Sequence, residues 1–281
     1  YDKGLVGGIS TGLASVDKLF TIVPGQLSVV TGLPGSGKSE FIDQIMVNLA
    51  QSEGWKFAVA SFENPPPLHI AKLSEKYVGK PFFEGSADRM SRVESVNAMK
   101  WVSDHFLFLE QRGGDSATIE SILDRARQAV MRLGIRGLVI DPYNYIAQSK
   151  SMDNEHQGIN EMLTKLVSFA RANQIHIWFI AHPAKMATNP DGTTAVPKGM
   201  NISGSAAFFA KADLGVTVHL SPEKDTEIHV WKCRFKWIGT TGGTVLGYDI
   251  PTGRYSEVKW DKLENPYETS KDWNETDSEW L

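Results

Sequence analysis

The sequence predicts an α/β fold in which helices cover both faces of a mostly parallel β-sheet. Two observations support this prediction. Short apolar runs alternate with longer segments of helical periodicity through most of the chain, as is typical of parallel strands buried on both faces. Beyond residue 214 the pattern changes to strands joined by short Gly, Pro and Asp turns, which is typical of antiparallel hairpins. The sheet is therefore expected to begin parallel and to end in antiparallel strands.

The positions of the elements follow from the spacing of apolar residues. Two segments place apolar side chains three and four residues apart, which marks one buried face of a helix. These faces comprise Ile119, Ile122, Leu123, Ala126, Val130 and Leu133 in one segment and Ile159, Met162, Leu163, Leu166, Val167 and Ala170 in the other. Buried strands are expected at 27–31, 57–62, 106–109, 137–140 and 175–180, and antiparallel strands at 214–220, 226–232, 244–250 and 254–258.

Composition and charge are those of an ordinary globular domain. The chain has 281 residues, of which 41% are hydrophobic and 22% charged. No apolar run approaches the roughly 18 residues that span a bilayer, so no membrane partner is expected. A single cysteine, Cys233, fits a reducing compartment because it can form no intrachain disulfide. With a net charge of −4, the chain would need a local cluster of Lys and Arg to bind nucleic acid.

Two regions are expected: a folded domain at 1–260 and a flexible acidic tail at 261–281. The tail has no periodicity and carries seven acids against two lysines. A tail of this kind, with its two tryptophans, can dock on a basic patch of a replication partner; a purely solvating tail is the alternative. Because the chain begins at Tyr1 rather than at a methionine, a further domain is expected before it.

A phosphate site is the strongest functional signal. Residues 32–39 match the P-loop pattern without a mismatch and lie between an expected strand and an amphipathic helix. In such a loop the backbone N–H groups turn toward phosphate oxygens, and the helix N-terminus adds its dipole. Lys38 would neutralise the β- and γ-phosphates, and Ser39 would ligate Mg²⁺. The expected phosphate-binding residues are Gly32, Pro34, Gly35, Ser36, Gly37, Lys38 and Ser39.

Three polar residues end buried strands, where a parallel sheet binds its ligands. Asp141 can hold the Mg²⁺ shell; the alternative is a cap or turn aspartate. Glu63 can polarise the water that attacks the γ-phosphate, and the alternative is that Glu63 and Asn64 cap the next helix. His182 can hydrogen-bond the γ-phosphate, and the alternative is a structural histidine at a strand end.

Together these motifs resemble the motor domains of superfamily 4 helicases, which include the DnaB-type helicases, phage helicase-primases and Twinkle. The resemblance covers about residues 8–257. It implies a RecA-like P-loop NTPase core that hydrolyses ATP or another NTP, with Mg²⁺, at the subunit interfaces of a hexameric ring. The motifs that carry it are Ile-Ser-Thr-Gly-Leu at 9–13, Ser-Phe-Glu-Asn-Pro at 61–65, His-Pro at 182–183, Gly-Ser-Ala-Ala at 204–207 and Lys-Cys-Arg-Phe at 232–235.

The same resemblance implies roles for residues late in the chain. Arg234 would be an arginine finger that reaches the nucleotide of the neighbouring subunit, with Lys232 as its companion; a solvated strand of alternating charge is the alternative. Tyr248 would pack on the nucleotide base, although a plain strand tyrosine fits as well. Within and after a DNA-facing loop at 183–203, the expected contacts are Lys185, Asn189, Lys198, Gly204 and Ser205, with a solvated surface loop as the alternative.

The expected function is therefore the motor domain of a replicative DNA helicase that translocates on single-stranded DNA and unwinds the duplex. A RecA- or RadA-type recombinase filament and a KaiC-like regulatory ATPase are the alternatives. The implied partners are single-stranded DNA, further copies of the chain and an upstream primase domain. The implied location is the cytoplasm of a bacterial or phage-infected cell, or the mitochondrial matrix.

Overall fold

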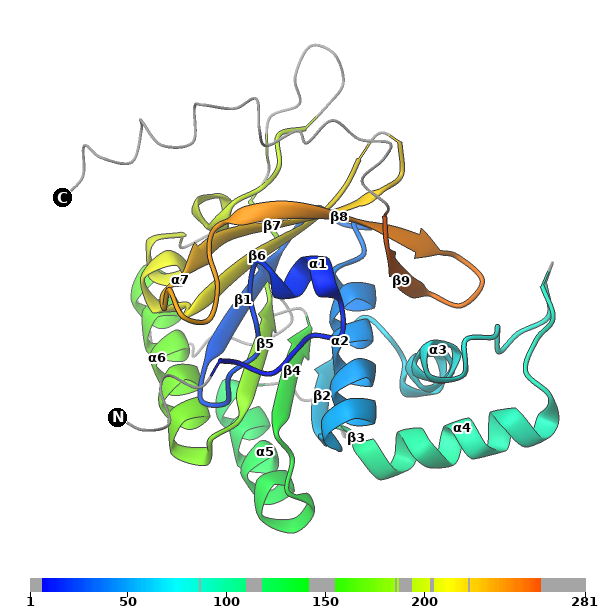
Figure 1. The fold of residues 1–281 in the computed structure, drawn as a ribbon. Coiled ribbons are helices and arrows are strands. Elements are labelled where there is room, and N and C mark those ends of the chain that lie inside the picture. Colours follow the sequence, from blue (N-terminus) through cyan, green and yellow to red (C-terminus); the bar gives the residue numbers. More distant parts are fainter. Residues whose placement is uncertain are drawn as a thin grey trace.

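One nine-stranded sheet organises the fold (Figure 1). A computed structural model of the chain describes residues 7–85, 87–109, 118–141, 155–184, 186, 194–202, 205–221 and 223–258. Of the predicted nucleic-acid contacts, Lys185, Asn189 and Gly204 lie outside the described residues, as does the acidic tail at 261–281.

The sheet has the strand order β3-β2-β4-β5-β1-β6-β7-β8-β9. The pairs from β3 to β6 in this order are parallel, and β7, β8 and β9 continue the sheet with antiparallel pairs. The strands are β1 (Leu27–Thr31), β2 (Phe57–Ser61), β3 (Phe106–Phe108), β4 (Gly137–Asp141), β5 (His176–Ile180), β6 (Leu214–Leu220), β7 (Thr226–Cys233), β8 (Gly242–Asp249) and β9 (Arg254–Glu257).

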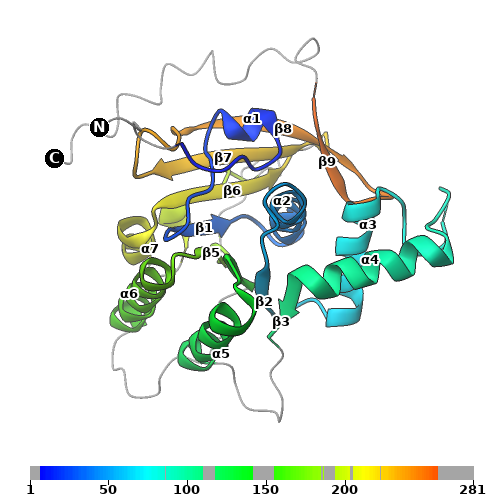
Figure 2. The same ribbon diagram turned by 60° about the horizontal axis from the view of Figure 1, so that its bottom comes forward.

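Helices cover both faces of the sheet (Figure 2). One face is covered by α1 (Ala14–Asp17), α2 (Lys38–Glu53), α3 (Pro66–Val78) and α4 (Arg92–His105). The other is covered by α5 (Ile119–Leu133), α6 (Glu155–Asn173) and α7 (Ser205–Lys211), which the short 3₁₀ turn η2 (Gly199–Asn201) precedes. Among the described residues, every helix is too short or too polar to cross a membrane.

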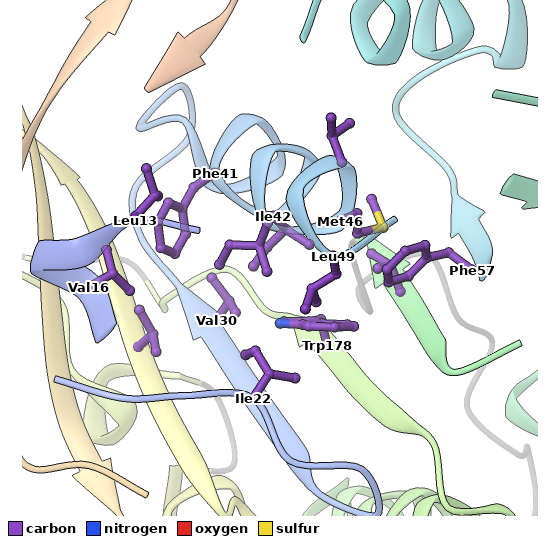
Figure 3. Close-up of a cluster of buried hydrophobic side chains, with 14 of the residues drawn as sticks. Leu13, Val16, Ile22, Val30, Phe41, Ile42, Met46, Leu49, Phe57 and Trp178 are labelled. Atoms are coloured by element: carbon purple, nitrogen blue, oxygen red, sulfur yellow. The ribbon is translucent and has the colours of Figure 1, made fainter. Parts of the chain in front are cut away.

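Helix α2 packs a row of apolar side chains against the sheet (Figure 3). Its side chains Phe41, Ile42 and Leu49 are buried against the sheet, where Val30 of β1 and Trp178 of β5 lie in the same cluster. Burying each such side chain stabilises the fold by about 1.5–3 kcal/mol. This packing fixes the N-terminus of α2, and with it the P-loop, relative to the strand ends.

The predicted architecture is confirmed. The parallel strands, the antiparallel extension and both predicted helical faces are present, and the strand boundaries differ from the expected ones by no more than two residues. The predicted faces on α5 and α6 pack into one cluster on the second side of the sheet, with one correction: Leu133, in the last turn of α5, is 45% exposed and lies outside the cluster.

Candidate functional site

Four adjacent strands deliver the predicted catalytic residues to one edge of the sheet. Strands β2, β4, β5 and β1 are neighbours and parallel, so their carboxyl ends lie together. Glu63 follows β2, Asp141 ends β4, His182 follows β5 and the P-loop follows β1. The topology therefore gathers residues that are up to 150 positions apart, from Gly32 to His182.

The P-loop has the tight backbone that its glycines allow. Gly32 has φ 151° and Gly37 has φ 89°, values at which a side chain is strained. A Cβ at Gly32 would also lie 2.2 Å from the carbonyl oxygen of Val218, and one at Gly37 would lie 2.8 Å from the Tyr255 hydroxyl. Helix α2 begins at the next residue, Lys38, so its unpaired N–H groups open toward the pocket as an anion site.

Lys38 is held inside the loop that it serves. Its ammonium donates to the carbonyl oxygens of Gly32 at 3.0 Å and Leu33 at 2.9 Å. Burial lowers the pKa of Lys38, and the carboxylates of Asp141 and Glu63 oppose this shift. The side chain is thus a desolvated cation directed at the phosphate pocket, which is the role expected of a P-loop lysine.

Ser39 and Asp141 form the arrangement expected of a Mg²⁺ site. The Ser39 hydroxyl donates to Asp141 Oδ2 at 2.5 Å. Burial raises the pKa of Asp141, and the bond from Ser39 opposes that shift. A buried carboxylate beside a hydroxyl and a phosphate cradle suits a divalent cation, which prefers oxygen ligands.

Glu63 points toward His182. Glu63 Oε1 lies 3.4 Å from His182 Nε2, and the carboxylate is 42% exposed, so it faces the open pocket rather than the core. The alternative in which Glu63 or Asn64 caps α3 is wrong, because Pro65 is the N-cap and makes no side-chain capping bond. Glu63 is therefore free to act on a water in the pocket.

An open pocket of about 360 Å³ joins these groups. Sequence reasoning missed three of its lining residues: Glu40, Asn64 and Lys72. The Lys72 ammonium lies 2.9 Å from Glu40 Oε1 and 3.4 Å from Asn64 Oδ1, so it ties α3 to the P-loop helix and to the residue after Glu63. No short motif could reveal Lys72, because it enters the pocket only through the packing of α3 on α2.

A buried ion pair fixes α3 against α2 more deeply. His69 Nε2 lies 2.8 Å from Asp43 Oδ1, and both side chains are 3% exposed. Burial alone would lower the pKa of His69, but the Asp43 carboxylate reverses the effect and the pKa is raised. Asp43 follows Ser39 by one helical turn. A carboxylate at that spacing, on an otherwise apolar helix face, is the sequence feature that could have predicted a buried partner for it.

Lys232 and Arg234 lie near the amino ends of the parallel strands, whereas the P-loop lies at their carboxyl ends. Strand β7 runs antiparallel to β6, and Lys232 and Cys233 pair with Gly215 and Leu214 at the start of β6. Leu214 in turn pairs with Ser28, four residues before Gly32. At about 3.3 Å per residue the two sites are separated by roughly 13 Å along the strand direction alone, besides the two intervening strand spacings. The predicted pair therefore cannot reach the P-loop of its own chain.

The carbonyl end of α7 holds both cations. The Arg234 guanidinium donates to Ala210 at 2.7 Å and Ala212 at 3.3 Å, and its Nε lies 3.2 Å from Asp213 Oδ1. The Lys232 ammonium donates to the carbonyl oxygen of Phe209. Burial, with the charge of Arg234 beside it, lowers the pKa of Lys232 to about 8. The carbonyl groups at a helix C-terminus attract cations, so this arrangement is stable without a partner subunit.

Two further predicted residues have definite positions. Tyr248 lies on β8, half-buried, with its ring 5.0 Å from that of Tyr255 and the Lys76 ammonium 5.8 Å from its centroid. It is not among the residues that line the phosphate pocket, so its contact with a base remains a prediction. Lys198 precedes η2, where its N–H donates to Asn201 Oδ1 at 2.8 Å. Ser205 begins α7.

Comparison with known families identifies this core. Residues 6–188 match the family described as AAA domain, a span that contains the P-loop, Glu63, Asp141 and His182. The chain belongs to this family.

Three curated relatives match most of the chain. The chain is 42% identical over 270 residues to the Twinkle homolog protein, chloroplastic/mitochondrial, of Arabidopsis thaliana; the match covers 92% of this chain and 38% of that protein. It is 29% identical to a probable plasmid replicative DNA helicase of Chlamydia psittaci, over 90% of this chain and 56% of that protein. It is 24% identical to the DNA helicase/primase of Enterobacteria phage T3, over 80% and 40%. The chain thus spans only part of each relative.

Solved structures share the fold. One of them, described as an ATPase domain, superposes with a TM-score of 0.74 at 17% identity, covering 91% of this chain and 93% of that one. A DnaB-like replicative helicase, solved for its interactions with primase, gives a TM-score of 0.75 at 16% identity over 92% of this chain and 66% of that one. The predicted RecA-like fold and the resemblance to DnaB-type and Twinkle-like helicases are confirmed.

Proposed function

We propose that this chain is the ATP-dependent motor domain of a replicative DNA helicase, and that each hydrolysis site forms between two copies of it. The proposal rests on the separation of the phosphate site from Lys232 and Arg234. Because β7 runs antiparallel to β6, these two residues lie at the end of the strands that is far from the P-loop. A protomer binds the phosphates at the carboxyl ends of its parallel strands and carries Lys232 and Arg234 near their amino ends. The two halves meet only when protomers pack edge to edge, as in a closed ring of six.

The residues divide the work of hydrolysis between the two protomers. In one protomer, the P-loop N–H groups and Lys38 bind the phosphates, and Glu63 orients a water and accepts its proton. The neighbour supplies Arg234, whose guanidinium neutralises the charge that develops on the γ-phosphoryl oxygens, worth about 10³ to 10⁵ in rate. Lys232 adds a second charge beside it.

Ser39 and Asp141 are the residues that would hold Mg²⁺, given their 2.5 Å contact at the mouth of the P-loop. Bound there, the metal would supply charge neutralisation to the phosphates. His182 lies between Glu63 and the start of the 183–203 loop, so a change in its hydrogen bonding at the γ-phosphate would displace that loop.

The proposed track for single-stranded DNA is the set of 183–203 loops that line the ring. Their predicted contacts remain Lys185, Asn189, Lys198, Gly204 and Ser205. Several such loops around one strand would concentrate positive charge that a single chain of net charge −4 lacks. An upstream primase domain, a partner for the acidic tail and a location in a bacterial, phage-infected or organellar compartment are further proposals, supported by the helicase/primase and chloroplastic/mitochondrial names of the relatives.

The test is complementation between two defective proteins. Arg234→Ala should retain nucleotide affinity and lose hydrolysis, and Lys38→Ala should lose nucleotide binding. Mixed assemblies should regain part of the activity, because an Arg234→Ala protomer that binds nucleotide can receive the finger of a Lys38→Ala neighbour. Arg89→Ala, at an exposed surface ion pair with Glu84, is the matched control and should behave as the unaltered chain. Normal DNA-stimulated turnover by Arg234→Ala alone would refute the shared site.

Two alternative functions differ from the helicase in assembly and in response to DNA. A RecA- or RadA-type recombinase uses the same core in a helical filament, so electron micrographs of the full-length protein with nucleotide should show closed rings if the proposal holds. A KaiC-like regulatory ATPase acts without DNA. A hydrolysis rate that single-stranded DNA leaves unchanged would therefore favour that alternative, whereas unwinding of a forked duplex would exclude it.

A further inference from the structure

Strand β7 contains a β-bulge at Trp231. Gly215 of β6 pairs with Lys232, whereas the next residue, Val216, pairs with Val230. Trp231 is therefore an extra residue on β7, opposite no residue of β6. Because side chains alternate between the two faces of a strand, one inserted residue reverses the alternation beyond it.

The bulge turns the two cations toward α7. Val230 and Cys233 pack in the cluster on the α2 face, so the regular alternation is broken between them. Trp231 and Lys232 are consecutive, yet both reach α7: the Trp231 ring stacks on Phe209 with centroids 5.9 Å apart, and the Lys232 ammonium lies 5.0 Å from the same ring centroid. If β7 alternated regularly through Trp231, with no bulge, Lys232 and Arg234 would face the opposite side of the sheet.

The Trp231 ring also occupies a slot that connects to the predicted DNA loop. A Cβ at Gly199, in η2, would lie 2.6 Å from the ring, and a Cβ at Gly215 would lie 2.4 Å from it. Only glycines allow so close an approach. The ring is thus wedged between β6 and the last part of the 183–203 loop. Its buried Nε1 has no hydrogen-bond partner among the described residues, so contact rather than polar bonding sets its position.

The loop is fixed to the same strands at one further point. The Thr217 hydroxyl donates to the Pro197 carbonyl oxygen at 2.5 Å. The two ends of the loop are joined to each other by an isolated bridge between Pro183 and Ile202. A displacement of the loop segment that carries Gly199 would therefore press on the Trp231 ring, which is also in close contact with Gly215 of β6.

We propose that Trp231 is a positioning residue that transmits the state of the DNA-facing loop to Lys232 and Arg234, and hence to the hydrolysis site of the neighbouring protomer. This inference rests on the proposed function. DNA that engages the loop of one protomer would shift the ring through Gly199. The bulge joins that ring directly to Lys232, so the cations that serve the neighbour move with it. Stimulation of hydrolysis by DNA would then pass between protomers along this route.

The test exchanges volume between the two contacting residues. Gly199→Ala adds a methyl group that collides with the ring, and Trp231→Phe removes the outer part of the ring that the methyl group would meet. Each single variant should lower the factor by which single-stranded DNA stimulates hydrolysis, by at least about fivefold, a typical allosteric coupling. The double variant restores the contact and should recover most of the stimulation. Gly85→Ala, where an added Cβ meets nothing within 4 Å, is the matched control.

Three measurements separate the possible outcomes. Hydrolysis without DNA and affinity for a labelled oligonucleotide should stay within about twofold for Trp231→Phe, since coupling rather than either site is altered. Thermal unfolding curves identify any variant that has lost its fold, and Trp231→Phe, the milder change, then carries the test. Single variants with unaltered stimulation, or a double variant no better than the worse single one, would overturn the role of Trp231. An unaltered protein that DNA fails to stimulate would instead overturn the proposed helicase function, and this inference with it.

Discussion

Asp213 and Arg234 form an ion pair in which Oδ1 and Nε are 3.2 Å apart. The carboxylate is buried, with 1% of its side chain exposed, while the guanidinium is 34% exposed. The other carboxylate oxygen accepts the N–H of Leu27 at 3.1 Å, so Asp213 is fastened to the first residue of β1. Arg234 is thereby held against the centre of the sheet while about a third of its side chain stays exposed.

Asp213→Asn is expected to weaken hydrolysis without affecting nucleotide affinity. Loss of the carboxylate charge removes a charge-assisted contact worth about 1.5–3 kcal/mol, so the rate should fall by about ten- to a hundredfold. Steady-state hydrolysis and binding of a fluorescent nucleotide, measured on the assembled protein, check this. Asp124→Asn, at an exposed pair with Arg127, is the control and should change neither quantity. A matching loss of nucleotide affinity in Asp213→Asn would contradict the assignment.

Glu63→Gln is expected to slow hydrolysis by about 10² to 10⁴, the usual contribution of a general base. Nucleotide affinity should change little, because the amide keeps the size of the side chain and its approach to His182. Single-turnover hydrolysis is the appropriate measurement, since it separates chemistry from product release. Glu84→Gln, on an exposed surface pair, is the matched control. Residual turnover close to the unaltered rate would show that another group activates the water.

The pH profile of hydrolysis should lose activity on its alkaline side. Burial and the neighbouring Arg234 lower the pKa of Lys232 to about 8, so the side chain is charged below that pH and neutral above it. Turnover should therefore decline as pH rises through about 8. In Lys232→Arg the guanidinium stays charged, and the decline should move to higher pH. Hydrolysis rates of the unaltered protein and of Lys232→Arg, measured between pH 7 and 10, test this prediction. Identical profiles would mean that the charge of Lys232 does not cause the alkaline decline.

Stability should fall between about pH 6.5 and 4 because of His176. Complete burial lowers its pKa from 6.5 to about 4, while Val23 accepts a hydrogen bond from Nδ1 and Ser28 contacts Nε2 at 2.8 Å. In that window the unfolded chain binds a proton that the folded chain refuses, so the free energy of unfolding decreases as pH falls. The loss should reach about 2 kcal/mol at pH 5. Urea unfolding of the unaltered chain and His176→Gln at pH 7.5 and 5 measures it; parallel losses in both proteins would exclude His176.

The edge that binds phosphate could be predicted because its residues follow apolar strands directly. Asp141 ends such a strand and Glu63 comes two residues after one, so the parallel sheet alone brings them together. The sequence of helix α4 shows little helical periodicity of apolar residues, because the only side chains that the helix buries fully are Ala98 and Val102. Periodicity detects a helix by its buried face, and a helix that covers the rim of a sheet has a narrow one.

Lys72 and Trp231 show what a sequence pattern leaves out. Lys72 joins the pocket because α3 lies across α2, a tertiary relationship that local spacing does not encode. The bulge at Trp231 depends on the pairing register of β6 and β7. A regular strand with strictly alternating side chains would have placed Lys232 and Arg234 on the α2 face of the sheet, away from α7. Their grouping with α7 therefore emerges only from the folded chain.

The reversal of direction at β7 has a genetic consequence. In the proposed assembly each protomer completes a site whose other half lies in another copy of the chain, so an alteration of Arg234 would silence an intact P-loop next to it. In a cell with one normal and one altered allele, the proposed assembly predicts that the altered product joins the normal one and is dominant-negative. A truncated product that cannot join would leave normal assemblies untouched and behave as recessive.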